Sequence, residues 1–72
     1  MRLLTLAQTK VYEFMLDYRE ENKMPPTVRE IQDGLAIRHI NTVCGHLTAL
    51  EKKKYIYREL RKSRGIKFLR VA

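Results

Sequence analysis

The chain has 72 residues, with 15 Lys and Arg against eight Asp and Glu, two His and one Cys, and its formal net charge is +7. A chain this short forms one domain and buries only about 60% of the surface of its unfolded state, which leaves little room for a deep catalytic pocket. One cysteine excludes an internal disulfide and fits a reducing compartment, and no apolar run approaches the roughly 18 residues that cross a bilayer. We therefore expect one cytoplasmic domain, residues 1–72.

The positive charge is confined to the second half of the chain. Residues 1–38 hold six Lys or Arg and six acids, whereas residues 39–72 hold nine Lys or Arg and two acids, which gives the whole +7. Such asymmetry indicates a polyanionic partner. The alternative is a solvated basic tail, but apolar residues are interleaved with these cations as they are in folded strands.

A first helix is predicted to start at Thr5, because Gln8 follows at the spacing of a capping box. Its apolar residues recur at helical steps and are assigned to the core: Ala7, Val11, Phe14, Met15 and Tyr18. The helix should end near residues 22–23, because the Met-Pro-Pro that follows cannot continue it. These prolines fix an extended entry to the next helix. That entry either aims a helix N-terminus at a phosphate or only makes a stiff turn.

Residues 27–54 are predicted to form a helix-turn-helix. Thr27 and Glu30 repeat the capping-box spacing, and Ile31 and Leu35 then face one way. After a break at residues 36–39, apolar residues return on one helical stripe: Ile40, Val43, Leu47 and Leu50. The opposite face carries short polar residues and then cations: Asn41, Thr42, Cys44, Gly45, Thr48, Lys52 and Lys53. Such a face can lie in a DNA groove, with its early residues near bases and its later ones near phosphates.

Residues 55–71 are predicted to form a β-hairpin. Two runs rich in strand formers, 55–60 and 66–71, flank a basic tip with Arg61, Lys62 and Arg64, in which Gly65 can take a positive φ. A lone hairpin is marginal in water, so it should pack on the helices. Three helices followed by a basic two-stranded hairpin form an α+β winged helix-turn-helix, in which the hairpin is the wing.

Enzymatic chemistry is not expected. Cys44 and His46 are two residues apart, so on a helix they point to different sides, and His39 lies five residues before Cys44. A zinc site needs about four ligands, and the chain has only three His or Cys residues. We therefore expect no catalytic residue, no metal, no cofactor and no small-molecule substrate.

Two short motifs frame the helix-turn-helix and the wing: Met-Pro-Pro-Thr at residues 24–27 and Ser-Arg-Gly-Ile at residues 63–66. In combination they resemble the N-terminal DNA-binding domain of the LexA repressor family, the regulators of the SOS response. Further matching residues are Leu4, Thr5, Gln8, Val11, Glu30, Ile31, Leu35, Arg38, Asn41, His46, Leu47, Ala49, Leu50, Lys53, Ile56 and Leu69.

The resemblance implies a repressor domain whose third helix enters the major groove of double-stranded DNA. It implies that Asn41 reads a base, and Asn can pair with adenine through two hydrogen bonds. Candidate base-reading residues are Asn41, Thr42, Cys44 and Gly45. Candidate contacts to the DNA backbone, those of the wing included, are Thr27, Arg38, His39, Thr48, Lys52, Lys53, Lys54, Arg61, Lys62 and Arg64.

The chain departs from the family at several positions. Cys44 and Gly45 replace two consecutive acids, which can accept hydrogen bonds from cytosine amino groups, so we expect a sequence preference different from the SOS operator. Ala36 replaces a turn glycine, which predicts a reshaped turn or an earlier end to the second helix. Lys54 replaces another glycine and should add a phosphate contact or a strained helix end.

The self-cleaving second domain of LexA repressors has no counterpart in these residues. We expect either an excised domain or a protein that consists of the DNA-binding module alone. One module buries only about 600–1,000 Å² on DNA, so useful specificity requires a homodimer on a palindrome or a partner protein.

Two other functions compete with DNA binding. One is a small winged-helix protein-interaction module that modulates a polymerase or a larger repressor. The other is binding to a membrane surface, which is disfavoured because the apolar residues near the cations belong to a hairpin and not to an amphipathic helix. The cations of the wing favour DNA, and we expect a nucleoid-associated protein in the cytoplasm.

Overall fold

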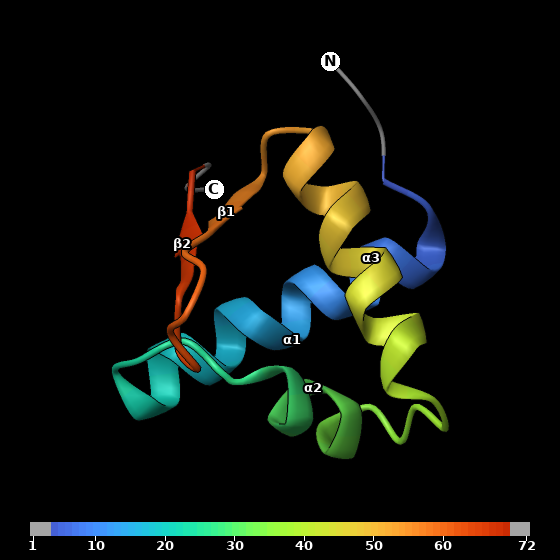
Figure 1. Cartoon of the computed structure of the whole chain (residues 1–72). Coiled ribbons are helices and arrows are strands. Elements are labelled where there is room, and N and C mark those ends of the chain that lie inside the picture. Colours follow the sequence, from blue (N-terminus) through green and yellow to red (C-terminus); the bar gives the residue numbers. More distant parts are fainter. Residues whose placement is uncertain (1–3, 70–72) are drawn as a thin grey trace.

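The computed structural model describes residues 4–69, which form three helices followed by a two-stranded hairpin (Figure 1). The elements are α1 Leu6–Asn22, α2 Val28–Gly34, α3 Ile40–Lys52, β1 Ile56–Arg58 and β2 Ile66–Phe68. This arrangement confirms the predicted winged helix-turn-helix. The strands are shorter than predicted, and residues 70–71 of the second predicted strand lie outside the described part.

Capping boxes begin both α1 and α2, as the sequence predicts. At α1 the Thr5 hydroxyl accepts from the Gln8 N–H at 3.1 Å, and the Gln8 side chain accepts from the Thr5 N–H at 3.1 Å. At α2 the Thr27 hydroxyl accepts from the Glu30 N–H at 3.1 Å, and Glu30 Oε1 accepts from the Thr27 N–H at 2.9 Å. These bonds satisfy N–H groups that have no partner within the helix.

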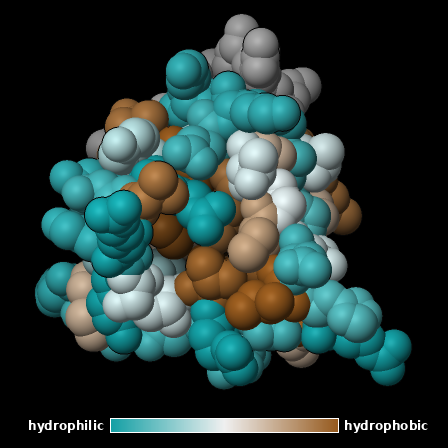
Figure 2. All heavy atoms as spheres, viewed as in Figure 1, coloured by the Kyte–Doolittle hydropathy of each residue, from teal (hydrophilic) through white to brown (hydrophobic). Residues whose placement is uncertain are grey.

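The buried core joins all three helices to the hairpin. Figure 1 shows α1 through the middle of the molecule, with α3 and the hairpin on either side of it. The buried apolar residues are Val11, Tyr12, Met15, Ile31, Val43, Leu47, Leu50, Ile56 and Ile66. Figure 2 shows hydrophilic side chains over most of the face in view, with an apolar area near its middle. A domain this small cannot cover all of its apolar surface.

Two residues of the predicted core, Ala7 and Ile40, are exposed, and Phe14, Tyr18 and Leu35 are only partly buried. In α1, Tyr12 is buried in place of Ala7. Tyr12 is covered by the hairpin side of the molecule, because its ring centroid lies 5.2 Å from that of Tyr55 and 6.2 Å from that of Phe68. Ile40 remains 37% exposed, since it is the first residue of α3 and the core begins one turn later at Val43.

The register of the hairpin decides which face packs on the helices. The strands are antiparallel, with Ile56 opposite Phe68, Tyr57 opposite Lys67 and Arg58 opposite Ile66. Ile56 and Ile66 are buried, whereas Tyr57 is 51% exposed and Lys67 is exposed. Tyr57 and Lys67 therefore form the outer face. The inner face is held further by Arg19 of α1, whose guanidinium lies 4.5 Å from the centre of the Phe68 ring.

The turn of the wing differs from the prediction. Arg61, and not Gly65, takes the positive φ, at 70°. Gly65 is required for space, because a Cβ at this position would lie 2.6 Å from the Glu59 carbonyl oxygen. The Glu59 N–H also donates to the Gly65 carbonyl at 2.8 Å. This bond holds the two sides of the hairpin close together at its turn.

The residues that replace the two family glycines lie in the turns at both ends of α3. Ala36 has a φ of 53° and Lys54 a φ of 67°, a left-handed conformation that is costly for residues other than glycine. The second helix ends early, at Gly34, where a Cβ would overlap the ring of Phe14. The turn before α3 and the turn after it are therefore strained at Ala36 and Lys54.

Gly65→Ala should lower the free energy of unfolding by about 1–3 kcal/mol, because the backbone of Glu59 must move to admit the methyl group. Gly45→Ala is the matched control. It adds the same group where no atom lies within 4 Å, and it should stabilise the helix by up to about 1 kcal/mol. Urea unfolding followed by circular dichroism measures both changes, and equal stability of the Gly65 variant and the unchanged protein would refute the spatial role of this glycine.

Candidate nucleic-acid interface

The two faces of α3 are separated as the sequence predicts. Val43, Leu47 and Leu50 are fully buried against the other elements. On the opposite side the exposed residues are Asn41, Thr42, Gly45, Thr48 and Lys52, and Cys44 is partly exposed. The core therefore fixes the helix, and a row of short polar side chains that ends in a cation faces solvent.

Arg38 and His39 lie just before α3, beside the backbone N–H groups at the start of this helix. His39 occupies the N-cap position and makes no side-chain hydrogen bond to the helix. Both Arg38 and His39 are exposed, and the Gln32 side chain donates to the Arg38 carbonyl at 3.3 Å, which steadies the turn. Backbone N–H groups and the helix dipole favour an anion at such an end.

The lysines at the end of α3 differ in their surroundings. Lys52 is exposed on the polar face. Lys53, a predicted contact to the DNA backbone, donates from its Nζ to Gln8 Oε1 at 2.7 Å. This bond joins the end of α3 to the start of α1. Lys54 is exposed in the left-handed turn that follows.

The tip of the wing exposes Arg61 and Lys62. An acid within the wing offsets part of this charge, since Glu59 lies 3.2 Å from Lys67 Nζ and 3.6 Å from Lys62 Nζ. The hydrogen bond from Lys67 is the main cause of the lowered pKa of Glu59, and the charge of Lys62 adds to it. The wing is therefore less positive than its Lys and Arg residues alone indicate.

Arg64, a predicted contact to DNA, is bound within the protein. Its Nη1 donates to Glu30 Oε1 at 2.7 Å and to the Pro25 carbonyl at 3.0 Å, and its Nη2 donates to Glu30 Oε2 at 2.8 Å. The prediction placed this guanidinium at phosphate or in the minor groove. The structure turns it toward the start of α2, and Figure 1 shows the tip of the wing lying against the segment between α1 and α2.

The Glu30 carboxylate is strongly stabilised in its charged form. Its pKa falls from 4.5 to about 2, first through the Arg64 hydrogen bonds and then through the Thr27 N–H, with a smaller contribution from Tyr18. The same bonds raise the pKa of Arg64. The hydroxyl of Thr27, a predicted contact to the DNA backbone, meanwhile accepts from the Glu30 N–H.

Sequence reasoning overlooked three residues of this surface. Glu59 and Lys67 lie within the wing, and Glu30 was assigned only to a cap. Lys67 follows the buried Ile66, so strand alternation would have placed it on the outer face. No local pattern signals the partner of Glu30, because Arg64 lies 34 residues away.

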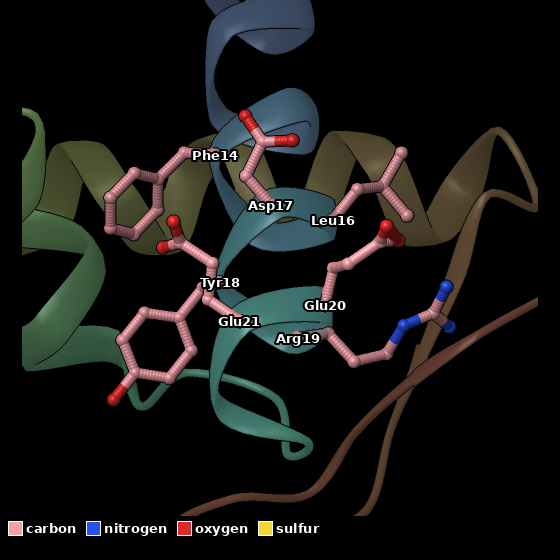
Figure 3. Close-up of a pocket in the computed structure, with 7 residues that line it drawn as sticks. All are labelled: Phe14, Leu16, Asp17, Tyr18, Arg19, Glu20 and Glu21. Atoms are coloured by element: carbon pink, nitrogen blue, oxygen red, sulfur yellow. The ribbon is translucent and has the colours of Figure 1, made fainter.

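A hollow along α1 is an alternative candidate site among the described residues. It has a volume of about 520 Å³ and surrounds the second half of the helix. Figure 3 shows its side chains on both sides of the helix, with Phe14 and Tyr18 on one side and Leu16 and Arg19 on the other, so they do not converge on a ligand. Within residues 4–69, no three His, Cys, Asp or Glu side chains gather in a group that could hold a metal ion. In the same range, no helix combines the length and apolar character needed to cross a membrane.

Comparison with known proteins identifies the family. The family model described as the LexA DNA binding domain matches residues 1–65. The chain belongs to the LexA DNA-binding domain family. This is a family of DNA-binding repressor domains and not of enzymes.

Curated relatives agree with this assignment. The LexA repressor of Clostridium perfringens (strain 13 / Type A) is 37% identical over 65 residues, which cover 90% of this chain and 32% of the relative. That of Desulfatibacillum aliphaticivorans is 41% identical over 70 residues, or 97% and 34%. That of Roseiflexus sp. (strain RS-1) is 44% identical over 64 residues, or 89% and 29%. The chain spans about a third of the length of these LexA repressors.

Acid should weaken the fold through Glu30. Because the pKa of Glu30 is lowered in the folded state, its contribution is complete above about pH 4.5 and is lost as the pH falls toward about 2. Glu30→Gln should lower the melting temperature at about pH 6 and reduce the further loss between about pH 5 and pH 2. Thermal unfolding across this range measures the effect, with the exposed α1 variant Glu20→Gln as control. An unchanged pH dependence in Glu30→Gln would contradict the assignment.

Proposed function

We propose that this chain binds double-stranded DNA in a sequence-specific manner, as the DNA-binding module of a LexA-type transcriptional repressor. The observation that supports this most directly is α3, which is fixed on one side by Val43, Leu47 and Leu50 and exposes short polar residues and a lysine on the other. In a chain of the LexA DNA-binding domain family, such a helix fits the major groove.

The proposed roles follow the order of residues along α3. Asn41 and Thr42, in its first turn, would read bases, and Arg38 and His39 just before them would approach the backbone. Thr48 and Lys52, further along the exposed face, would meet phosphates.

Cys44 and Gly45 would lie over the bases in the middle of the helix. A Cβ at Gly45 would have no protein atom within 4 Å, so this position is open on the exposed side of the helix. Neither residue can accept a hydrogen bond as a carboxylate does. The proposed consequence is a preference that differs from the SOS operator at the base pairs that face this part of α3.

The wing would contribute charge without reading the sequence. Arg61 and Lys62 are exposed at its tip and are proposed to contact the DNA backbone, as is Lys54 at the end of α3. Lys53 already donates to Gln8, and Thr27 belongs to the cap of α2, so their contribution to DNA binding is proposed to be smaller.

One module gives a small interface, so we propose that two copies occupy the halves of a palindrome or that a partner protein adds contacts. The relatives are about three times as long as the matched region and are named as repressors. Repression of transcription is the proposed outcome of binding. A protein that binds chromosomal operators acts at the nucleoid, in the cytoplasm.

The proposal predicts tight, salt-sensitive binding to duplex DNA with little preference for the SOS palindrome over a shuffled sequence. Fluorescence anisotropy of the 72-residue chain on both duplexes, at several salt concentrations, measures it. The log–log slope should be about −0.9 for each phosphate contacted. Failure of the folded protein to bind either duplex would overturn DNA binding in favour of a protein-interaction module, and strong preference for the SOS palindrome would overturn the role of Cys44 and Gly45.

Two single substitutions on α3 should have different signatures. On a preferred duplex recovered by selection from a random library, Asn41→Ala should reduce discrimination against other sequences by about 1–3 kcal/mol. Lys52→Ala should weaken binding to all duplexes alike and reduce the salt slope by about 0.9. Lys10→Ala removes an exposed lysine of α1 and serves as the control for Lys52→Ala. Equal loss on every sequence in Asn41→Ala would exclude a base-reading role for this residue.

A further inference from the structure

Two segments that lie 34 residues apart in the sequence meet at the carboxylate of Glu30. Glu30 Oε1 accepts from the Thr27 N–H at the start of α2 and from Arg64 Nη1 in the wing. Glu30 Oε2 accepts from Arg64 Nη2. Arg64 also donates to the carbonyl of Pro25, in the segment that enters α2. Arg64 therefore joins the wing to two acceptor atoms of α2 and to one in the segment that enters it.

The ion pair between Arg64 and Glu30 is strong for one near the surface. The pair is bidentate, with both donor–acceptor distances below 3 Å, and the two side chains are only 35% and 32% exposed. Planar, charge-assisted pairs of this kind are about twice as strong as neutral hydrogen bonds and have a fixed geometry. A lysine at position 64 would keep the charge but lose the fork.

The wing has little else to fix its tip. Each strand is three residues long, and a two-stranded hairpin is marginal unless it packs on other elements. Ile56 and Ile66 anchor the strands in the core, but the tip residues Arg61 and Lys62 lie beyond them and are exposed. At the end of the tip, Arg64 donates from both Nη1 and Nη2 to Glu30 of α2.

Charge opposes a direct role of Arg64 at a phosphate. Its guanidinium is neutralised by Glu30 at contact distance. A phosphate that captured it would leave the Glu30 carboxylate unpaired, and that carboxylate would repel the phosphate. A guanidinium that remains with Glu30 has no such cost.

We propose that Arg64 is a positioning residue for DNA binding, which holds the wing against α2 through Glu30 so that Arg61 and Lys62 meet the DNA backbone together with α3. This rests on the proposed DNA-binding function and deepens it. When Arg64 is released, the wing must be ordered at the moment of binding, and affinity falls by that cost.

The two roles of Arg64 predict opposite results for Glu30→Gln. If Arg64 contacted phosphate, removal of Glu30 would free a cation, and the affinity would rise or stay unchanged. If Arg64 positions the wing, Glu30→Gln should weaken binding roughly threefold to tenfold although the protein becomes more positive. The salt slope should also become shallower, because the wing lysine and arginine lose their contacts. A purely structural loss of stability would not change this slope in folded protein.

The experiment measures anisotropy on one duplex across a salt series, at a temperature at which circular dichroism shows every variant folded. The variants are Glu30→Gln, Arg64→Lys, Arg64→Ala and the double variant Glu30→Gln/Arg64→Ala. Each single change should weaken binding to a similar extent, and the double variant should bind no worse than either one, because all break the same contact. Glu20→Gln, which removes an exposed α1 carboxylate, is the charge-matched control and should leave the affinity nearly unchanged.

The outcomes separate this inference from the function on which it rests. If the unchanged protein does not bind the duplex, the proposed function fails. If it binds, and Glu30→Gln binds as tightly or more tightly with an unchanged slope, the positioning role is overturned and DNA binding stands. Retention of full affinity by Arg64→Lys would likewise overturn it, because only the charge would then matter.

Discussion

The arrangement of this domain depends on the Glu30 carboxylate. α2 has only seven residues, so it is too short to be stable as an isolated helix. Its start is set by the bond from the Thr27 N–H to Glu30, and the same side chain receives both guanidinium donors of Arg64. One side chain thus takes part both in the cap of α2 and in the contact between α2 and the wing. The start of α2 and its contact with the wing both affect the position of the wing relative to α3.

The core and the candidate interface share α3, and the two are separated by helical periodicity alone. Val43, Leu47 and Leu50 bury one face, and the residues between them in the sequence, such as Thr42 and Thr48, are exposed. A change on the buried face therefore disturbs the whole domain, whereas a change on the exposed face alters recognition with little effect on packing. This separation lets a small domain change its DNA preference while it keeps its fold.

Local signals in the sequence predicted most of the fold, and the errors arose where residues distant in the sequence meet. The capping boxes and the two prolines gave the starts of α1 and α2 and the end of α1, because each depends on neighbours within four residues. The burial of Tyr12 in place of Ala7 depends on the rings of Tyr55 and Phe68, which arrive from the hairpin. In the same way, the role of Gly65 follows from the nearness of Glu59, and that of Arg64 from Glu30.

Ion pairs formed in the fold also change the distribution of charge on the chain. Residues 1–38 have a net charge of zero and residues 39–72 a net charge of +7. These sums ignore contacts between the two halves of the chain. In the fold, Glu30 from the first half neutralises Arg64 of the second, and Glu59 lies beside both Lys62 and Lys67. Fewer Lys and Arg side chains are therefore free of an acidic neighbour than the number of Lys and Arg residues in the second half suggests. Because phosphate attraction is independent of sequence, under the proposed function a reduced wing charge would lower binding to all DNA and leave discrimination to the exposed face of α3.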